Sequence, residues 1–370
     1  MLPSRLRALL KRVSRSFYLS IRVLPDVIAM PMGLSYLLAR AADTVADTDW
    51  LPPETRLLLL SELSAAMVGD AAALCRLCFL LREKLPASSR QGLADSERTL
   101  LSVLPDCVDL HLASKETDRA LVSAVLLQLV TGMQTDLRRF PAAGSVERAE
   151  QVVALRTRAD LSEYTYFAAG CVGEFCARLF ASHVPGLSGL RSSEALQRGC
   201  ALGEVLQMTN VVRDLAQDLK IGRCYVPEDM LSARGLLASQ LFEWTKTPPQ
   251  RETDRAALRG LTADLLTHAL ALVDEAWPFV LALPARHLRL RLCSAWPLFL
   301  ALDTLTLVEQ AGSPLFWPHP VRVSRSSVYS MLFSTTATMG QARLGQDDAQ
   351  LVRLFRTRRD GLEQRLGKHP

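Results

Sequence analysis

The sequence has few aromatic and few β-branched residues, and both shortages argue against a sheet protein. Phe, Trp and Tyr together make up 6% of the 370 residues, whereas Leu and Ala dominate. Aromatic and β-branched side chains pack well on a pleated sheet, while Leu and Ala favour helices. The composition therefore predicts a helical globular protein.

Long uninterrupted apolar runs are also missing. The longest ones, such as LVSAVLLQLV and WPLFLAL, are shorter than the roughly 18 to 20 residues that span a bilayer. The basic N-terminal stretch has no continuous apolar region and no small-residue cleavage site, so it does not resemble a secretory signal. We expect a cytoplasmic protein without a transmembrane helix.

Several patterns typical of other functions are absent as well. The sequence has no GxSxG motif, no GxGxxG after a strand, and no metal-ligand spacing among its six histidines. The eight cysteines are scattered, and the CxxC at Cys75 and Cys78 has no second half, so we expect reduced thiols packed in the core. Because the net charge is only +5 and no basic run alternates with aromatic residues, we expect no nucleic-acid partner.

The sequence pattern predicts helices, because Leu, Ala and Val recur at helical spacing over segments of about 20 to 35 residues. Breaks rich in Pro, Gly or Ser separate these segments at 85–92, 140–145, 183–193, 246–250 and 311–320. No internal repeat or shift in composition marks a second domain. We predict an all-α protein in which 1–370 form a single domain, one bundle of many helices, with a basic helical extension at 340–370.

A polar stripe runs along one of these apolar segments. Tyr36, Arg40, Asp43 and Asp47 are separated by 4, 3 and 4 residues, and nearly everything around them is apolar. That spacing places them on one face of a helix. A surface helix has the reverse pattern, one apolar stripe on a polar cylinder, so this polar line should face a cavity.

A second stripe of the same kind lies downstream, where Gln207, Asn210, Asp214 and Asp218 are separated by 3, 4 and 4 residues. A single acidic pair on a helix usually faces solvent or binds a neighbouring arginine, but here the pattern occurs twice. Two pairs on facing helices would gather four carboxylates, which need hard cations, and oxygen ligands suit Mg²⁺. Arg40, Arg213 and Arg223 would add forked donors to phosphate oxygens, and the apolar walls suit a long hydrocarbon. We therefore expect a diphosphate site.

Four blocks of sequence resemble the squalene and phytoene synthase family, the head-to-head prenyl diphosphate synthases, from residue 14 to 325. They are SRSFYLS (14–20), YLLARAADTVADT (36–48), EYTYFAAGCVGEF (163–175) and LQMTNVVRDLAQDLKIGRCYVP (206–227), and a weaker block is GMQTDL (132–137). The resemblance implies the isoprenoid synthase fold with a central cavity, in which the four aspartates hold Mg²⁺. It implies that Tyr164 is the reactive tyrosine and that Phe167 shields carbocations. The expected contacts of the substrate diphosphates are Ser14, Arg15, Tyr36, Arg40, Gln207, Asn210 and Arg213.

The resemblance also implies a reaction. Two farnesyl diphosphates condense to presqualene diphosphate, which NADPH then converts to squalene. The segment HPVRVSRSSV resembles the family's flap over the nicotinamide cofactor, so Arg322, Arg325 and Asn210 are the expected NADPH contacts, an ordinary solvated loop being the alternative. Three other functions stay open: a dehydrosqualene or phytoene type of synthase without NADPH, a synthase of presqualene diphosphate only, and an inactive assembly protein of the same fold.

Basic residues are concentrated near both ends of the chain. They are Arg5, Arg7, Lys11, Arg12 and Arg15 at one end and Arg353, Arg356, Arg358 and Arg359 at the other. Eukaryotic squalene synthases carry a membrane-anchoring helix at their end, and this chain stops at LGKHP instead. We expect a monomer that contacts an anionic membrane peripherally through these ends, the alternative being a solvated surface.

Overall fold

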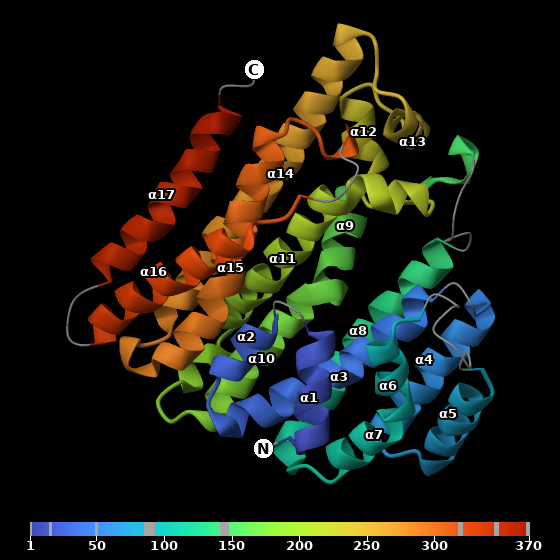
Figure 1. The fold of residues 1–370 in the computed structure, drawn as a ribbon, viewed down its shortest axis with the longest axis vertical. Helices are drawn as coiled ribbons and strands as arrows, with labels where there is room; N and C mark the ends of the chain where they lie inside the picture. The colour runs from blue at the N-terminus through green and yellow to red at the C-terminus, as the bar shows by residue number, and fades with distance from the viewer. Residues whose placement is uncertain are drawn as a thin grey trace. The chain divides into compact units, whose positions relative to one another are not determined.

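The computed structural model describes residues 2–14, 17–48, 51–84, 93–140, 148–316, 321–343 and 348–367. Regular structure in these ranges is almost entirely helical, which confirms the predicted all-α class (Figure 1). The chain divides into two compact units, unit 1 (Met1–Pro141 and Glu174–Ser192) and unit 2 (Ala142–Gly173 and Ser193–Pro370). The expectation of a single domain over 1–370 stays a prediction.

Unit 1 is built around α3, which packs on α1, α4, α6, α7 and α8. Its helices are α1 (Ser4–Val13), α2 (Phe17–Val23), α3 (Asp26–Asp47), α4 (Pro53–Met67), α5 (Ala71–Lys84), α6 (Asp95–Ser102), α7 (Leu104–Leu112), α8 (Glu116–Arg139), η4 (Ser188–Arg191) and most of α10 (Cys171–His183). Apart from α3 and α8, these helices are shorter than the expected segments because turns interrupt them. Gly69, with φ 99°, follows the end of α4, since its lack of a Cβ permits this left-handed conformation.

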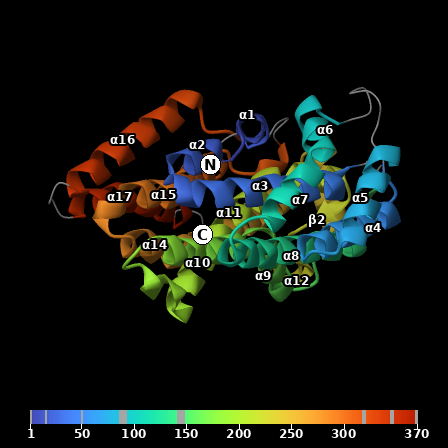
Figure 2. The ribbon, with the colours of Figure 1, turned by 90° about the horizontal axis from the view of Figure 1, so that it is seen from below.

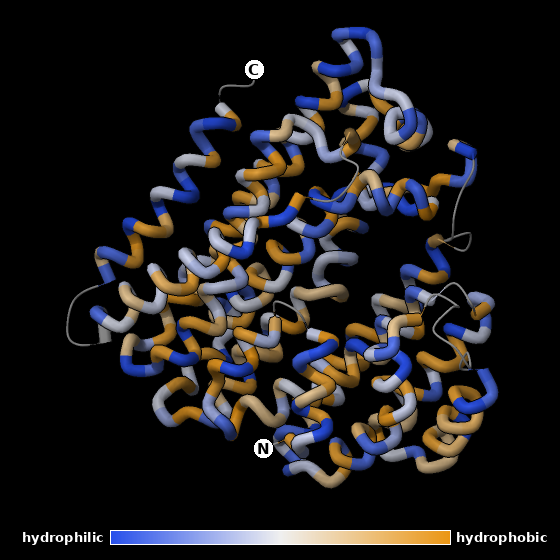
Figure 3. The backbone as a smooth tube through the Cα atoms, viewed as in Figure 1, coloured by the Kyte–Doolittle hydropathy of each residue, from blue (hydrophilic) through white to orange (hydrophobic). Residues whose placement is uncertain are grey.

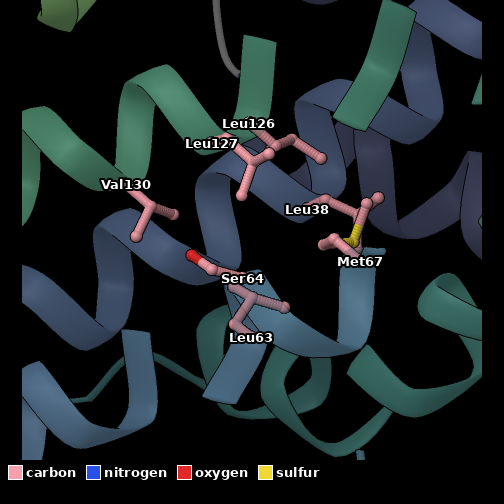
Figure 4. A pocket seen from close by; sticks show the side chains of 7 residues that line it. All are labelled: Leu38, Leu63, Ser64, Met67, Leu126, Leu127 and Val130. Carbon is pink, nitrogen blue, oxygen red and sulfur yellow. The ribbon is translucent and has the colours of Figure 1, made fainter. Parts of the chain in front are cut away.

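A small apolar pocket lies between α3, α4 and α8 (Figure 4). Its lining is Leu38, Leu63, Ser64, Met67, Leu126, Leu127 and Val130. The Ser64 hydroxyl donates to the Leu60 carbonyl at 3.0 Å, as serines inside helices often do. Leu38 is fully buried, so this pocket belongs to the apolar side of α3.

Unit 2 is built around α11, which packs on α14, α15 and the π-helical turn η3. Its elements are η2 (Ala149–Gln151), β1 (Val153–Ala154), α9 (Arg158–Thr165), η3 (Tyr166–Gly170), α11 (Ser193–Lys220), β2 (Arg223–Cys224), α12 (Glu228–Ala233), α13 (Ala238–Lys246), α14 (Glu252–Ala282), η5 (Ala285–His287), α15 (Leu288–Gln310), η6 (Pro314–Phe316), α16 (Arg325–Arg343) and α17 (Ala349–Leu366). The two short strands pair in parallel, with Val153 opposite Arg223. Figure 2 shows α15, α16 and α17 within this unit.

Helix α17 alternates hydrophilic and hydrophobic turns (Figure 3), and ion pairs and aromatic contacts hold it on α14 and α15. Arg291 is fully buried, and both of its terminal N–H groups donate hydrogen bonds to the Asp348 carboxylate, at 2.8 and 2.9 Å. The rings of Trp277 and Phe355 stack with their centroids 4.0 Å apart. An ion pair and an aromatic contact therefore fix this helix against α14 and α15.

One expectation from the sequence is wrong, and another stays a prediction. Within the described ranges, three segments are long and apolar enough to cross a membrane by length and composition: Glu116–Arg139, Glu252–Ala282 and Ala285–Gln310, each with an 18-residue window of mean hydropathy 1.3. The expectation of no transmembrane helix considered uninterrupted apolar runs only, and it stays a prediction. All eight cysteines are free, but Cys75 is exposed rather than packed in the core.

Candidate functional site

The polar stripe of unit 1 lies on a single face of α3. Leu37, Leu38, Ala41 and Ala42 are fully buried, whereas the stripe residues Tyr36, Arg40 and Asp43 are half-buried and Asp47 is exposed. The apolar majority of the helix is thus used for packing inside unit 1. The narrow line that it leaves accessible carries two carboxylates, a guanidinium and a phenol.

Arg40 connects two carboxylates. Its guanidinium donates to Asp43, one turn further along α3, and to Glu97 of α6, at 2.6 Å. Desolvation by the surrounding atoms raises the pKa of Asp43 to about 6, and the charge of Asp47 adds to this rise while Arg40 opposes it. Two carboxylates four residues apart, one of them costly to ionise, form a donor set that fits a divalent cation.

Two further predicted residues of unit 1 lie near the end of α1. Ser14 is buried, and its hydroxyl donates to the Leu10 carbonyl at 2.5 Å. The Tyr36 hydroxyl donates to the carbonyl of Val13 at 3.4 Å, so the stripe of α3 begins beside Ser14. Arg15 lies outside the described residues.

Tyr164 sits in unit 2, near the end of α9. A capping box starts this helix, in which the Thr157 hydroxyl accepts from the Asp160 backbone N–H and the Asp160 carboxylate accepts from that of Thr157. Gln207 of α11 donates to the Tyr164 hydroxyl at 2.7 Å, and Asn210 donates to Gln207 at 3.2 Å. The side chains of α11 therefore form a polar row that ends on the Tyr164 oxygen.

A second aromatic ring holds Tyr164 from another side. The Tyr225 ring stacks on it with centroids 4.1 Å apart and an interplanar angle of 20°, and Tyr225 is only 5% exposed. Arg223 of β2 donates to the Tyr225 hydroxyl at 3.4 Å. The Tyr164 ring is therefore fixed by stacking and its oxygen by a hydrogen bond.

The acidic pair of unit 2 lies one to two turns further along α11. Arg213 donates to both carboxylate oxygens of Asp214, with Nε 2.8 Å from Oδ1, and Asp218 is half-buried one turn later. Each acidic pair thus contains one aspartate that binds an arginine of its own helix. Among the described residues, no three His, Cys, Asp or Glu side chains lie close enough together to hold a metal ion.

Small residues allow the segment after Tyr164 to approach α11 closely. A Cβ on Gly203 would lie 2.0 Å from the Ala169 carbonyl oxygen, and a Cβ on Gly173 would lie 1.8 Å from that of Gly199. Neither position can accept a side chain unless the backbone moves. The π-helical turn η3 begins two residues after Tyr164, and such turns are frequent at functional sites.

Arg322 and Arg325, the residues expected to contact NADPH, are exposed at the start of α16. Neither has an ion-pair partner within the ranges that the structure describes. Glu97, Tyr225 and Gly203 were not predicted as site residues. Tyr225 and Gly203 lie in or near the fourth sequence block, but Glu97 contacts Arg40 across 57 residues, which no local spacing reveals.

Comparison with known proteins matches the squalene/phytoene synthase family model to residues 10–327. The chain is 25% identical over 282 residues to the bifunctional lycopene cyclase/phytoene synthase of Pyrenophora tritici-repentis, covering 74% of this chain and 41% of that protein. It is 26% identical over 261 residues to the squalene synthase of Schizosaccharomyces pombe, covering 70% and 51%. The chain therefore spans about half or less of the length of these relatives.

Solved structures share the fold. The ligand complex of TcSQS superposes with a TM-score of 0.68 at 21% identity, covering 99% of this chain and 98% of that one. A dehydrosqualene synthase in complex with a ligand gives a TM-score of 0.57 at 22% identity, covering 91% and 96%. These similarities establish the all-α isoprenoid synthase fold, and the match to the family model shows that the chain belongs to the squalene/phytoene synthase family.

Proposed function

We propose that this chain catalyses the Mg²⁺-dependent head-to-head condensation of two farnesyl diphosphates to presqualene diphosphate and its NADPH-dependent rearrangement to squalene. The observation that carries the proposal is the row from Asn210 through Gln207 to Tyr164, on the same helix as an arginine-bound aspartate. Family membership and the squalene synthase among the relatives support it.

Diphosphate binding would use the two aspartate pairs, Asp43 with Asp47 and Asp214 with Asp218. Mg²⁺, when bound by these carboxylates, supplies the positive charge that stabilises a departing diphosphate. Arg40 and Arg213 already present forked donors beside Asp43 and Asp214. The same forks suit phosphate oxygens, so both guanidiniums would orient the leaving group.

Tyr164 would hold and move the proton at its hydroxyl oxygen while the first diphosphate leaves. Gln207 fixes this oxygen at 2.7 Å, and the stacked Tyr225 keeps water from one face of the ring. Tyr166 and Phe167, whose rings meet edge to face at 5.3 Å, provide aromatic surface next in sequence. Their electron-rich faces would stabilise a carbocation.

NADPH would supply a hydride, and Arg322 and Arg325 offer two exposed guanidiniums for its phosphates.

A second candidate is a dehydrosqualene or phytoene type of synthase that needs no NADPH. Relatives favour it, including a 15-cis-phytoene synthase of Pantoea ananas that is 33% identical over 157 residues. The presence of Tyr164 and all four aspartates argues against an inactive assembly protein. We place the enzyme in the cytoplasm, in peripheral contact with the membrane.

Incubation of the purified chain with farnesyl diphosphate and Mg²⁺, with and without NADPH, tests the proposal. We expect squalene only with NADPH, identified by gas chromatography and mass spectrometry. Its formation should be lost in Tyr164→Phe but not in Tyr18→Phe, which changes a half-buried tyrosine of α2. Dehydrosqualene or phytoene regardless of NADPH would establish the second candidate. Presqualene diphosphate alone, or no product, would contradict the two-step reaction.

A further inference from the structure

Helix α16 has an outward face unlike that of an ordinary surface helix. Residues 326–342 contain no charged residue, although most solvent-facing helices carry charges on their exposed side. Tyr329 and Phe333, one turn apart, are 67% and 78% exposed. These are the largest exposed fractions among the exposed large hydrophobic residues, and Val68 and Phe79 follow them. Around them the exposed positions are small, Ser326, Ser330 and Ala337.

The opposite face of α16 is fully used for packing. Met331, Thr335 and Met339 are buried, and the indole Nε1 of Trp296 in α15 donates to the Thr335 hydroxyl at 3.0 Å. Rotation of the helix to hide its aromatic rings would therefore break this contact and expose two methionines. The outward direction of Tyr329 and Phe333 is fixed by the packing of α16 on α15.

Positive charge is placed at one end of this face. Arg322 and Arg325 are exposed and have no ion pair with any described residue, and no acidic residue occurs between Arg322 and Arg343. Two of the four basic residues near the C-terminus are less available than the sequence suggested, because Arg358 binds Asp303 at 3.0 Å and Arg359 binds Asp274 at 2.7 Å. Aromatic rings beside unpaired arginines are complementary to the interface of an anionic bilayer.

We propose that the outward face of α16, with Phe333 and Tyr329 at its centre and Arg322 and Arg325 at its start, docks on the surface of an anionic phospholipid bilayer. Phe333 enters the acyl boundary, Tyr329 lies at the headgroup level with its hydroxyl in water, and the two guanidiniums bind headgroup phosphates when NADPH does not occupy them. This proposal rests on the membrane contact in the proposed function and names its surface, but it is separate from the reaction, because binding is measured without substrate or NADPH and holds whichever hydrocarbon is made.

The test is flotation of the full chain with vesicles of phosphatidylcholine alone and with about one quarter phosphatidylglycerol, at low and high salt. We expect wild type to bind the anionic vesicles and Phe333→Ser to lower the partition coefficient about tenfold. Phe79→Ser, which changes a ring of α5 that is 64% exposed, is the matched control and should bind as wild type does. Loss of each arginine by Arg322→Gln or Arg325→Gln should cost about fivefold on anionic vesicles and nothing on neutral ones.

Phe333→Trp keeps an apolar ring and should bind the vesicles as wild type does. This second variant tests the proposal even if Phe333→Ser fails to fold. Absence of wild-type binding, equal loss in Phe79→Ser and Phe333→Ser, or unchanged binding in Phe333→Ser would overturn the proposal. A dimer in size-exclusion chromatography with light scattering that Phe333→Ser dissociates would identify a second copy of the chain as the occupant and would overturn it as well.

Discussion

Arg40 is shared by two carboxylates, and these have different roles in the proposed reaction. Asp43 belongs to a pair proposed to bind Mg²⁺, so its charge is used when the metal is present. Glu97 comes from another helix and is not part of that aspartate pair. It nevertheless accepts a hydrogen bond of 2.6 Å from the same guanidinium. We therefore propose that Glu97 is a positioning residue, which would keep Arg40 oriented toward the substrate.

We expect Glu97→Gln to raise the KM for farnesyl diphosphate about tenfold, because it weakens a charge-assisted hydrogen bond to Arg40, with a smaller effect on kcat. Steady-state kinetics at saturating Mg²⁺ measures both constants. Glu62→Gln is the control, since Glu62 binds Arg76 at 2.8 Å in the same unit but away from Arg40. Equal effects of the two variants on KM would assign Glu97 a general structural role.

His111 of α7 gives unit 1 a pH-dependent stability. It is fully buried, with Nε2 2.9 Å from the Ser123 hydroxyl and 3.2 Å from the Met67 carbonyl, and Nδ1 has no partner among the described residues. Burial lowers its pKa, so the neutral ring is favoured in the folded chain. Below the unfolded pKa of about 6.5 the unfolded chain binds more protons, and stability is lost as pH falls.

We expect the free energy of unfolding of wild type to fall between pH 7 and pH 5 by up to about 1.4 kcal/mol per pH unit more than that of His111→Gln. Urea unfolding followed by circular dichroism at several pH values measures the difference. At neutral pH the variant should be the less stable protein, because it loses packing. Parallel pH profiles for the two proteins would show that His111 does not titrate on unfolding.

At the scale of helices, the polar stripes show what sequence can and cannot provide. The spacing of Tyr36, Arg40, Asp43 and Asp47 fixes their common face because a helix repeats every 3.6 residues, and the structure has them on one face of α3. The contact of Glu97 with Arg40 and the stacking of Tyr225 on Tyr164 depend on packing between elements, which periodicity does not encode. Turns such as Gly69 also divided segments that the apolar pattern had joined.

The approach of η3 to α11 leads to an element-scale prediction. Because a Cβ on Gly203 would lie 2.0 Å from the Ala169 carbonyl oxygen, Gly203→Ala must push η3 away and disturb the Gln207 to Tyr164 hydrogen bond. We expect a loss of about 1 to 3 kcal/mol in stability and a larger loss in kcat than in KM. Thermal unfolding and steady-state kinetics measure these effects.

Gly361→Ala in α17 is the matched control, since apart from its chain neighbours and the backbone of its own helix no described atom lies within 4 Å of its added Cβ. It should stabilise the protein by roughly 0.5 to 1 kcal/mol, because alanine is the better helix former. If Gly203→Ala were as stable and active as Gly361→Ala, the close packing of η3 on α11 would have no role in placing Tyr164.

At the scale of the whole molecule, the two acidic pairs belong to different compact units. Asp43 and Asp47 lie on α3 of unit 1, and Asp214 and Asp218 lie on α11 of unit 2. Within each unit one aspartate of the pair binds an arginine of its own helix, Asp43 with Arg40 and Asp214 with Arg213. The values of kcat of single and double variants show whether both pairs act in the same step of the reaction.

If both pairs serve the same metal-assisted departure of diphosphate, removal of either one disables the whole step, and the second removal costs little more. We expect Asp43→Asn and Asp214→Asn each to lower kcat about a thousandfold, and the double variant to be no more than a few-fold slower than either single one. Asp26→Asn, an exposed aspartate in the first turn of α3, should keep nearly full activity as a control for charge removal. Losses that multiply in the double variant would mean that the pairs act in separate steps, because independent contributions to a barrier add as free energies.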